Sequence, residues 1–270
     1  MNDCKEVKQI SMYIREWITK QPAVKEESLT DYLLFQISEK IPSIKYKAFS
    51  RQEESSSTGA DWEWWFVFSN YAYKLRVQAK KTKPKDNYSS IAYCPKNKEL
   101  QIEKLLKDAI NTNSIPFYAF YSNENGKVLC QKGINDEGVY IAGANTLYNS
   151  FVKTRQRVSA QDILSITNPL SCFFCCPLAI KHNGHRLSSF FENYYREENQ
   201  EAIRKNIDSE DKFLSNDNQV LGFHKSIPNY VSILIDKERK NVDEWYEGEF
   251  KNYIKEIDAI IVYDLRNKDY

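Results

Sequence analysis

The sequence has almost no excess of charge of either sign. Thirty-eight lysines and arginines stand against 37 aspartates and glutamates, which gives a formal net charge of +1 at pH 7. A chain so close to neutrality has no overall field that would attract a polyanion. Any binding of nucleic acid must therefore come from a local cluster of basic side chains.

Cysteines and long apolar runs are also scarce. Six cysteines in 270 residues are too few for a disulfide-rich secreted scaffold. The longest apolar stretch, residues 169–180, is shorter than the roughly 20 residues that a membrane-spanning helix needs. The N-terminus lacks the charged-then-apolar pattern of a signal peptide. We therefore expect a soluble cytoplasmic protein that does not bind membranes, and the richness in Lys, Ile and Asn favours a bacterial origin.

The composition that is present is that of a globular protein. Hydrophobic residues make up 41% and charged residues 28%, which excludes a disordered or collagen-like chain. The length admits one large or two modest domains. The hydrophobic pattern loosens after about residue 135, so we divide the chain into a core, residues 1–135, and a C-terminal extension of unknown role, residues 136–270. The sequence leaves open whether the extension packs on the same core.

Apolar periodicity predicts the elements of the first half. Apolar residues at helical spacing predict helices over residues 3–20, 26–40 and 100–111. Alternating or aromatic-rich runs predict strands over residues 43–50, 61–69, 73–80 and 115–121. The second and third of these strands are separated by a short turn and form a β-hairpin. This order indicates an α/β fold around a mixed sheet flanked by helices.

The second half is predicted to be mainly helical, with α+β character. Helices are expected over residues 144–153, 159–166, 187–206 and 241–256. Strands are expected over residues 229–236 and 257–263.

The predicted hairpin has an aspartate at its start and a Gln-x-Lys triplet at its end. The start of the first strand of a hairpin lies beside the end of the second. Side chains two positions apart in a strand share one face, so Gln78 and Lys80 project together. We therefore expect Asp61 to lie next to both of them.

These residues suit metal-dependent hydrolysis of a phosphodiester. Mg²⁺ prefers oxygen ligands and keeps several waters; Asp61 offers a carboxylate, Gln78 an amide oxygen and Ala79 a backbone carbonyl. The metal activates a bound water and neutralises charge on the phosphate, while Lys80 holds the phosphate or orients the water. Glu27, at the start of the helix over residues 26–40, completes the acidic pocket, and Glu26 is the alternative. The plainer interpretation is a hairpin edge with solvated charges.

The segments EESLTDYLL, TGADWEWW and VQAKK together resemble the PD-(D/E)xK nuclease superfamily, in particular its Mrr-like members with Gln-x-Lys in place of Glu-x-Lys. The resemblance covers roughly residues 20–122 and extends to bacterial proteins associated with phage defence. It implies a restriction-endonuclease-like core, with Asp61, Gln78 and Lys80 in the motif positions and Glu27 as the helix acid. The neutral Gln78 removes one anionic ligand from the pattern, which bears on metal affinity and on activity.

A basic run follows the hairpin aspartate and predicts contacts with a phosphate backbone. No acidic residue occurs between Trp64 and Lys85, and the run contains Lys74, Arg76, Lys80, Lys81, Lys83 and Lys85. We expect Arg76, Lys81 and Lys83 to bind nucleic acid. Gln101, at the start of the next helix, is a further candidate, because a polar residue on this helix often faces the site in the nucleases that the chain resembles.

A group of cysteines and histidines is the other candidate site. Its members are Cys172, Cys175, Cys176, His182 and His185, whose spacing allows a tetrahedral zinc site. Their flanks are apolar, and buried cysteines behave as small hydrophobes, so we favour core packing over zinc.

The sequence thus predicts a DNA nuclease that uses Mg²⁺ or Mn²⁺, with an anti-phage defence role implied by the resemblance. Two alternatives remain: a nucleic-acid-binding or sensor module with little or no catalysis, and an interaction protein stapled by zinc. A homo-oligomer or a defence-system partner is compatible with each.

Overall fold

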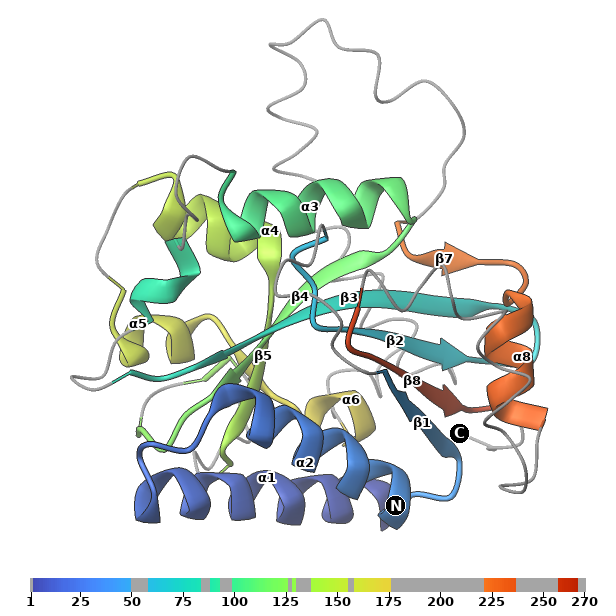
Figure 1. Ribbon diagram of the computed structural model, residues 1–270, viewed down its shortest axis with the longest axis horizontal. Coiled ribbons are helices and arrows are strands. Elements are labelled where there is room, and N and C mark those ends of the chain that lie inside the picture. The colour runs from blue at the N-terminus through green and yellow to red at the C-terminus, as the bar shows by residue number, and fades with distance from the viewer. Residues whose placement is uncertain are drawn as a thin grey trace, which may run out of the picture.

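The computed structural model describes residues 2–49, 58–83, 88–92, 99–125, 128–129, 137–154, 158–175, 221–236 and 257–266. An open mixed β-sheet runs through its centre in the order β1-β8-β2-β3-β4-β5-β6, with β7 paired to β3 (Figure 1). The strands are β1 Ile44–Ala48, β2 Trp62–Val67, β3 Ala72–Lys81, β4 Ile115–Tyr121, β5 Val139–Gly143, β6 Asn168–Pro169, β7 Phe223–His224 and β8 Ala259–Asp264.

Helices cover both faces of this sheet. In Figure 1, α1 and α2 lie below the sheet, and α3 and α4 lie above it. The helices are α1 Asn2–Lys20, α2 Glu26–Lys40, α3 Gln101–Asn111, α4 Ala144–Leu147, α5 Ala160–Ser165, α6 Cys172–Cys175 and α8 Asn229–Asp236, with a 3₁₀ turn over Ser89–Ala92 and a π-helical turn over Tyr148–Val152. The fold is therefore α/β, as the sequence predicts.

The hairpin strands are buried on both faces, and their side chains alternate between two cores. On β2, Trp62, Trp64 and Phe66 enter the core beneath α1 and α2. Trp65 and Val67 enter the core beneath α3. By the same alternation, Asp61 and Gln78 belong to the α3 side of the hairpin.

Strand β8 joins the two halves of the chain in one sheet. It lies between β1, to which it is antiparallel, and β2, to which it is parallel. Ile261 and Val262 of β8 contribute to the two opposite cores. The described residues on either side of residue 135 therefore share a sheet.

Every helix and strand predicted up to residue 121 is confirmed, with small differences at the ends. Farther along, α4 with its π-helical turn, α5 and β8 confirm three more predictions. The strand predicted over residues 229–236 is wrong, because this segment is helix α8. Its β-branched residues favour a strand, but Tyr230, Val231 and Leu234 are spaced to bury one helical face. The helices predicted over residues 187–206 and 241–256 lie outside the described residues.

No helix in the described part of the chain combines the length and the apolar character needed to cross a membrane.

Candidate functional site

The open end of the hairpin brings Asp61, Gln78 and Ala79 together, as the spacing predicts. The backbone N–H of Asp61 donates to the carbonyl oxygen of Val77 at 2.8 Å, which extends the ladder by one residue beyond β2. The Asp61 carboxylate then reaches across the hairpin. Its Oδ2 accepts hydrogen bonds from Gln78 Nε2 at 2.6 Å and from the Ala79 backbone N–H at 2.7 Å. One carboxylate oxygen thus organises the end of the hairpin.

The amide of Gln78 is held on both sides. Its Nε2 also donates to the carbonyl oxygen of Ala79 at 3.0 Å, and its Oε1 accepts from Gln101 Nε2 at 2.6 Å. Gln78 is only 1% exposed. On the far side of this chain of amides, Gln101 Oε1 is buried and has no hydrogen-bond partner. Gln101 therefore faces Gln78 from the first turn of α3. The sequence predicts a site-facing polar residue at this position.

The helix acid that reaches the site is Glu26, so the choice of Glu27 is corrected. Glu26 Oε1 lies 3.7 Å from Lys80 Nζ, and Glu26 Oε2 accepts the backbone N–H of Lys81 at 2.6 Å. Glu27 is exposed. Residues three and four apart share a helix face, and Glu26 stands at those distances from Leu29 and Thr30, which are buried against the sheet.

Burial raises the pKa of both site carboxyls, Asp61 and Glu26. Burial raises the pKa of Asp61 to about 7, although Lys80 and the Ala79 N–H pull it down, while Glu26 and Asp258 push it up. Burial likewise raises the pKa of Glu26 against the attraction of Lys80. A cation bound between these carboxyls would favour their ionised forms.

Asp258 is a neighbour of the site that the sequence does not reveal. It immediately precedes β8, and its backbone N–H donates to the carbonyl oxygen of Asp61 at 2.7 Å. The parallel register of Trp62 with Ala259 places Asp61 and Asp258 side by side at the start of their strands. No local signal could have found it, because the pairing of β8 with β2 joins residues about two hundred positions apart.

Among the residues of the basic run that the structure describes, most basic side chains are already paired within the protein; Lys85 lies outside the described residues. Arg76 is completely buried, with its NH2 3.4 Å from Glu63 Oε2 and its Nε 3.5 Å from Asp108 Oδ2. Lys81 Nζ donates to two backbone carbonyls of the α1–α2 connection, at 2.5 and 2.7 Å. The nucleic-acid-binding role expected of Arg76 is therefore wrong, and the ammonium of Lys81 is already engaged. Lys83 is exposed.

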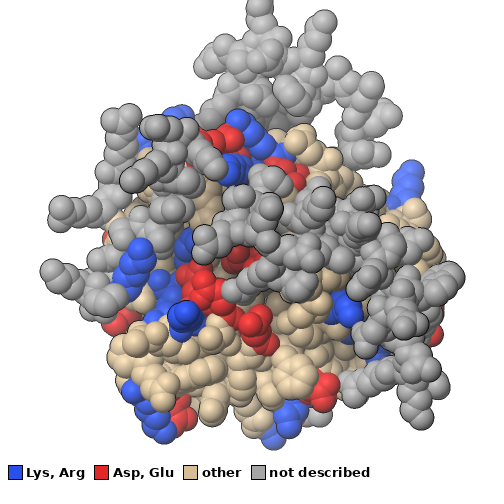
Figure 2. All heavy atoms as spheres, in the orientation of Figure 1, with Lys and Arg blue, Asp and Glu red and all other residues tan. Residues whose placement is uncertain are grey.

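The reason is that a strand covered on both faces has no solvated side. Lys74 and Lys80, like Arg76, point toward the α3 core, and acids remote in the sequence neutralise them there. Among the coloured residues on the face seen in Figure 2, acidic and basic side chains are interspersed, and no broad basic area is visible.

A buried ionic cluster of Glu63, Lys74 and Arg76 lies on the same face of the hairpin as Asp61 and Gln78. Together these side chains form the polar row of the hairpin. Glu63 is completely buried; its Oε1 accepts from Trp65 Nε1 and from the Tyr230 hydroxyl, each at 2.5 Å. Its Oε2 lies 3.1 Å from Lys74 Nζ. Burial alone would raise the pKa of Glu63, but the charges of Lys74 and Arg76 and the two hydrogen bonds together hold it below its usual range. Through Tyr230 the cluster ties α8 to the hairpin.

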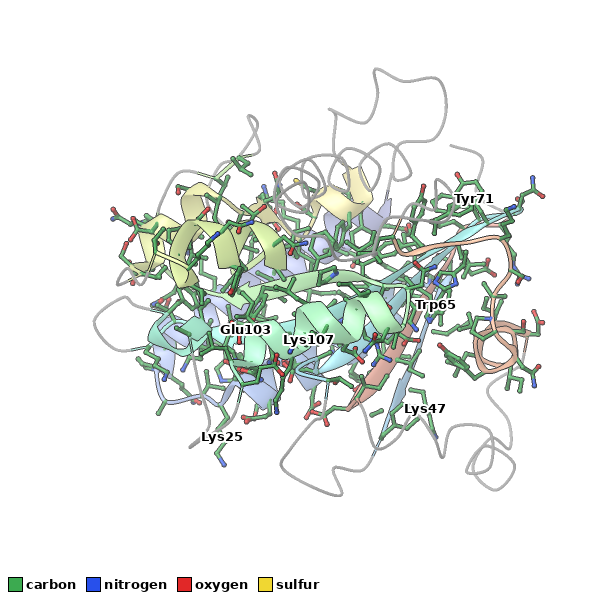
Figure 3. All side chains as sticks on the ribbon, turned by 90° about the horizontal axis from the view of Figure 1, so that it is seen from above. Lys25, Lys47, Trp65, Tyr71, Glu103 and Lys107 are labelled. Atoms are coloured by element: carbon green, nitrogen blue, oxygen red, sulfur yellow. The ribbon has the colours of Figure 1, made fainter. Side chains whose placement is uncertain are left out.

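Helix α3 covers this whole polar row. Seen from above in Figure 3, α3 crosses the sheet with Glu103 and Lys107 on it, and Trp65 lies near its far end. Gln101 contacts Gln78, Asp108 contacts Arg76, and the carbonyl oxygen of Thr112 accepts from Lys74 Nζ at 3.3 Å. Polar groups at the start, near the end and at the C-cap of α3 therefore contact alternate residues of β3.

The cysteine–histidine group is described only in part. Cys172 begins α6 and is buried, and its neighbour Phe173 packs edge-on against Trp64 with ring centroids 5.6 Å apart. These surroundings are those of a core residue. Cys176, His182 and His185 lie outside the described residues, so the prediction about zinc stays a prediction.

The chain belongs to a family of unknown function, DUF6615, whose model matches residues 4–268. No curated protein matches the sequence. The family match extends over both halves of the chain and includes Asp61, Gln78 and Lys80 as well as Asp258.

Proposed function

We propose that this member of the family is a metal-dependent nuclease that hydrolyses phosphodiester bonds in DNA with Mg²⁺ or Mn²⁺. The observation that carries the proposal is the gathering of the Gln78 amide and the Ala79 peptide around Asp61 Oδ2, with Lys80 beside them. A half-buried carboxyl, two neutral oxygen donors and a lysine are groups that suit cation-assisted hydrolysis of a phosphodiester.

The arrangement of elements supports a restriction-endonuclease-like core. A helix bearing the acid Glu26, an antiparallel hairpin, a further helix and a strand parallel to β3 follow one another in α2, β2–β3, α3 and β4. This is the order on which the sequence resemblance to PD-(D/E)xK nucleases rests. The insertion of β8 between β1 and β2 is a feature of this chain that the resemblance does not predict.

The oxygens present fit a small divalent cation. Asp61 Oδ2 and the Ala79 carbonyl oxygen lie 2.6 and 3.0 Å from the same atom, Gln78 Nε2, so both oxygens face the Gln78 amide. A half-turn of the terminal torsion would exchange that nitrogen for the amide oxygen and bring three oxygens together. Among the described residues, no three His, Cys, Asp or Glu side chains form a metal-binding group. Waters and substrate oxygens would therefore complete the coordination, as is common for Mg²⁺.

A cation held by Asp61, Gln78 and Ala79 would supply an activated water and would neutralise charge on the phosphate. The chain itself supplies the remaining groups. Lys80 is a compact cation with three donors, and it is positioned to bind a phosphate oxygen or to orient the attacking water. Glu26, whose Oε1 lies 3.7 Å from Lys80 Nζ, orients the Lys80 ammonium.

The choice between the two helix acids gives a paired prediction. Glu26→Gln removes the carboxylate that orients Lys80 and is expected to slow metal-dependent DNA cleavage by about 10- to 100-fold, the range for a group that positions another. Glu27→Gln, one residue along and exposed, should cleave at the wild-type rate. Initial rates on a supercoiled plasmid measure both variants. Equal rates for the two would mean that Glu26 has no part in the reaction.

The raised pKa of Asp61 predicts how the stability of the metal-free protein depends on pH. A folded pKa of about 7, against a usual value of 3.8, means that folding favours the protonated carboxyl. Its stabilising contribution is complete below the usual value and is lost as pH rises from there through about 7. Asp61→Asn cannot ionise, so its melting temperature should exceed that of wild type more at pH 8 than at pH 5.

The same two proteins test cation binding. Mn²⁺ at pH 8 should raise the melting temperature of wild type, because a ligand that binds only the folded state stabilises it. It should leave Asp61→Asn unchanged. Scanning calorimetry in EDTA and in Mn²⁺ gives both comparisons. A stability difference independent of pH, together with equal Mn²⁺ shifts in the two proteins, would remove Asp61 from the site.

A further inference from the structure

We propose that Gln101 is a positioning residue that sets which end of the Gln78 amide faces Asp61, and that cation binding reverses this Gln78–Gln101 pair. The inference rests on the proposed function, because it concerns the same cation. It assigns to Gln101 a role toward a metal ligand in place of the direct contact with nucleic acid that the sequence suggests.

The pair in the structure is oriented with the amide hydrogens of Gln78 toward Asp61. Gln78 turns its NH₂ group toward Asp61 Oδ2 and the Ala79 carbonyl oxygen, and turns its Oε1 toward Gln101 Nε2. The amide hydrogens thus contact the same two oxygens, Asp61 Oδ2 and the Ala79 carbonyl oxygen, that a cation would bind. An amide nitrogen is a donor only and cannot ligate Mg²⁺. The ligand atom that Gln78 would offer is therefore pointed away from Asp61.

Reversal of both amides removes this conflict. A half-turn about the terminal torsion of Gln78 exchanges its oxygen and nitrogen at little cost. Its NH₂ then faces Gln101, which must offer a hydrogen-bond acceptor. Gln101 has that acceptor in Oε1, an atom that is buried and has no hydrogen-bond partner in the present arrangement. The cation would replace the amide hydrogens on Asp61 and Ala79.

The position of Gln101 is fixed by the packing of α3. Gly59 has a positive φ of 71°, and a Cβ at this residue would lie only 2.6 Å from the Gln101 carbonyl oxygen. The loop before the hairpin therefore closes directly on the first turn of α3. Farther along the helix, Asp108 pairs with buried Arg76. With the backbone held at both points, the change is confined to the two amide groups.

Two substitutions of Gln101 should act in opposite directions. Gln101→Leu leaves the reversed NH₂ of Gln78 buried without an acceptor, so it should weaken Mn²⁺ binding about tenfold. Gln101→Glu presents acceptors only and holds Gln78 with its oxygen toward Asp61, so it should tighten Mn²⁺ binding by about threefold to tenfold. Lys104→Gln makes the same change of net charge on the same helix and serves as the control; its effect should stay within about twofold.

Titration calorimetry of the full-length chain with Mn²⁺ alone at pH 8 is the test. The Gln78→Glu background completes a double-mutant cycle. The two oxygens of a glutamate are equivalent, so no reversal is needed, and Gln101→Leu should then weaken Mn²⁺ binding far less than in wild type. Melting temperatures establish whether each variant folds. If Gln101→Leu does not fold, the comparison of Gln101→Glu with Lys104→Gln decides the test.

The outcomes separate this inference from the nuclease proposal. Opposite shifts for the two Gln101 variants, and a smaller effect in the Gln78→Glu background, support the reversal. Wild-type affinity for Mn²⁺ in both variants would overturn the role of Gln101 and leave the cation site intact. A gain in Mn²⁺ affinity in Gln101→Glu no larger than that in Lys104→Gln would have the same meaning. Failure of wild type to bind Mn²⁺ would overturn both proposals.

Discussion

Lys80→Met is expected to abolish most metal-dependent DNA cleavage, with a loss of about 100- to 1,000-fold, the cost of removing a positioned group that stabilises the transition state. The residue is 7% exposed, and methionine retains most of its buried aliphatic stem. Because Lys80 is not a proposed metal ligand, Mn²⁺ binding should persist. Removal of the ammonium also relieves the attraction that lowers the pKa of Asp61, so Mn²⁺ binding by the variant should need a higher pH.

Lys83→Met is the matched control for this variant. Lys83 lies three residues along the chain, is exposed and faces no carboxyl of the site in the described contacts. Cleavage rates on plasmid DNA and Mn²⁺ calorimetry on the same preparations measure both effects. If Lys80→Met cleaves as fast as Lys83→Met, the lysine of the hairpin takes no part in the chemistry.

Glu63→Ala is expected to lower the free energy of unfolding by about 3–5 kcal/mol. It removes the only carboxylate within ion-pair distance of buried Lys74 among the described residues. It also removes one of the two acids that the described residues place beside Arg76 and an acceptor of the Tyr230 hydroxyl. Buried Lys74 and Arg76 would then each lose the Glu63 carboxylate, and α8 would lose this hydrogen bond to the hairpin.

Urea unfolding followed by tryptophan fluorescence measures this loss. Glu16→Ala, in an exposed helical ion pair with Lys20, is the control and should leave the midpoint almost unchanged. Similar midpoints for the two variants would show that the Glu63 cluster is not a stabilising unit.

The sequence predicts those parts of the fold that depend on local pattern. The hairpin is one of them, because its first strand is rich in aromatic residues, its second strand alternates between apolar and polar residues, and a short turn separates them. The hairpin then determines the placement of Asp61 beside Gln78, since register follows from the turn. The same reasoning holds for α2 and α3, whose apolar stripes match their buried faces.

Features that depend on contacts between remote segments could not be predicted. Burial of the basic run is determined by α3 and by acids such as Asp108, which lie outside it. The neighbourhood of Asp258 is determined by the insertion of β8 into the sheet. The helical state of residues 229–236 is determined by packing of one face on the core, against a composition that favours a strand.

The most direct test of the central proposal is incubation of wild-type protein with supercoiled plasmid DNA at pH 8, in Mn²⁺ and in EDTA, beside Asp61→Asn. The proposed site predicts nicked and linear products with wild type in Mn²⁺, and intact plasmid both in EDTA and with the folded Asp61→Asn variant. Cleavage by Asp61→Asn at the wild-type rate, or cleavage by wild type that persists in EDTA, would contradict a cation-dependent site at the end of this hairpin.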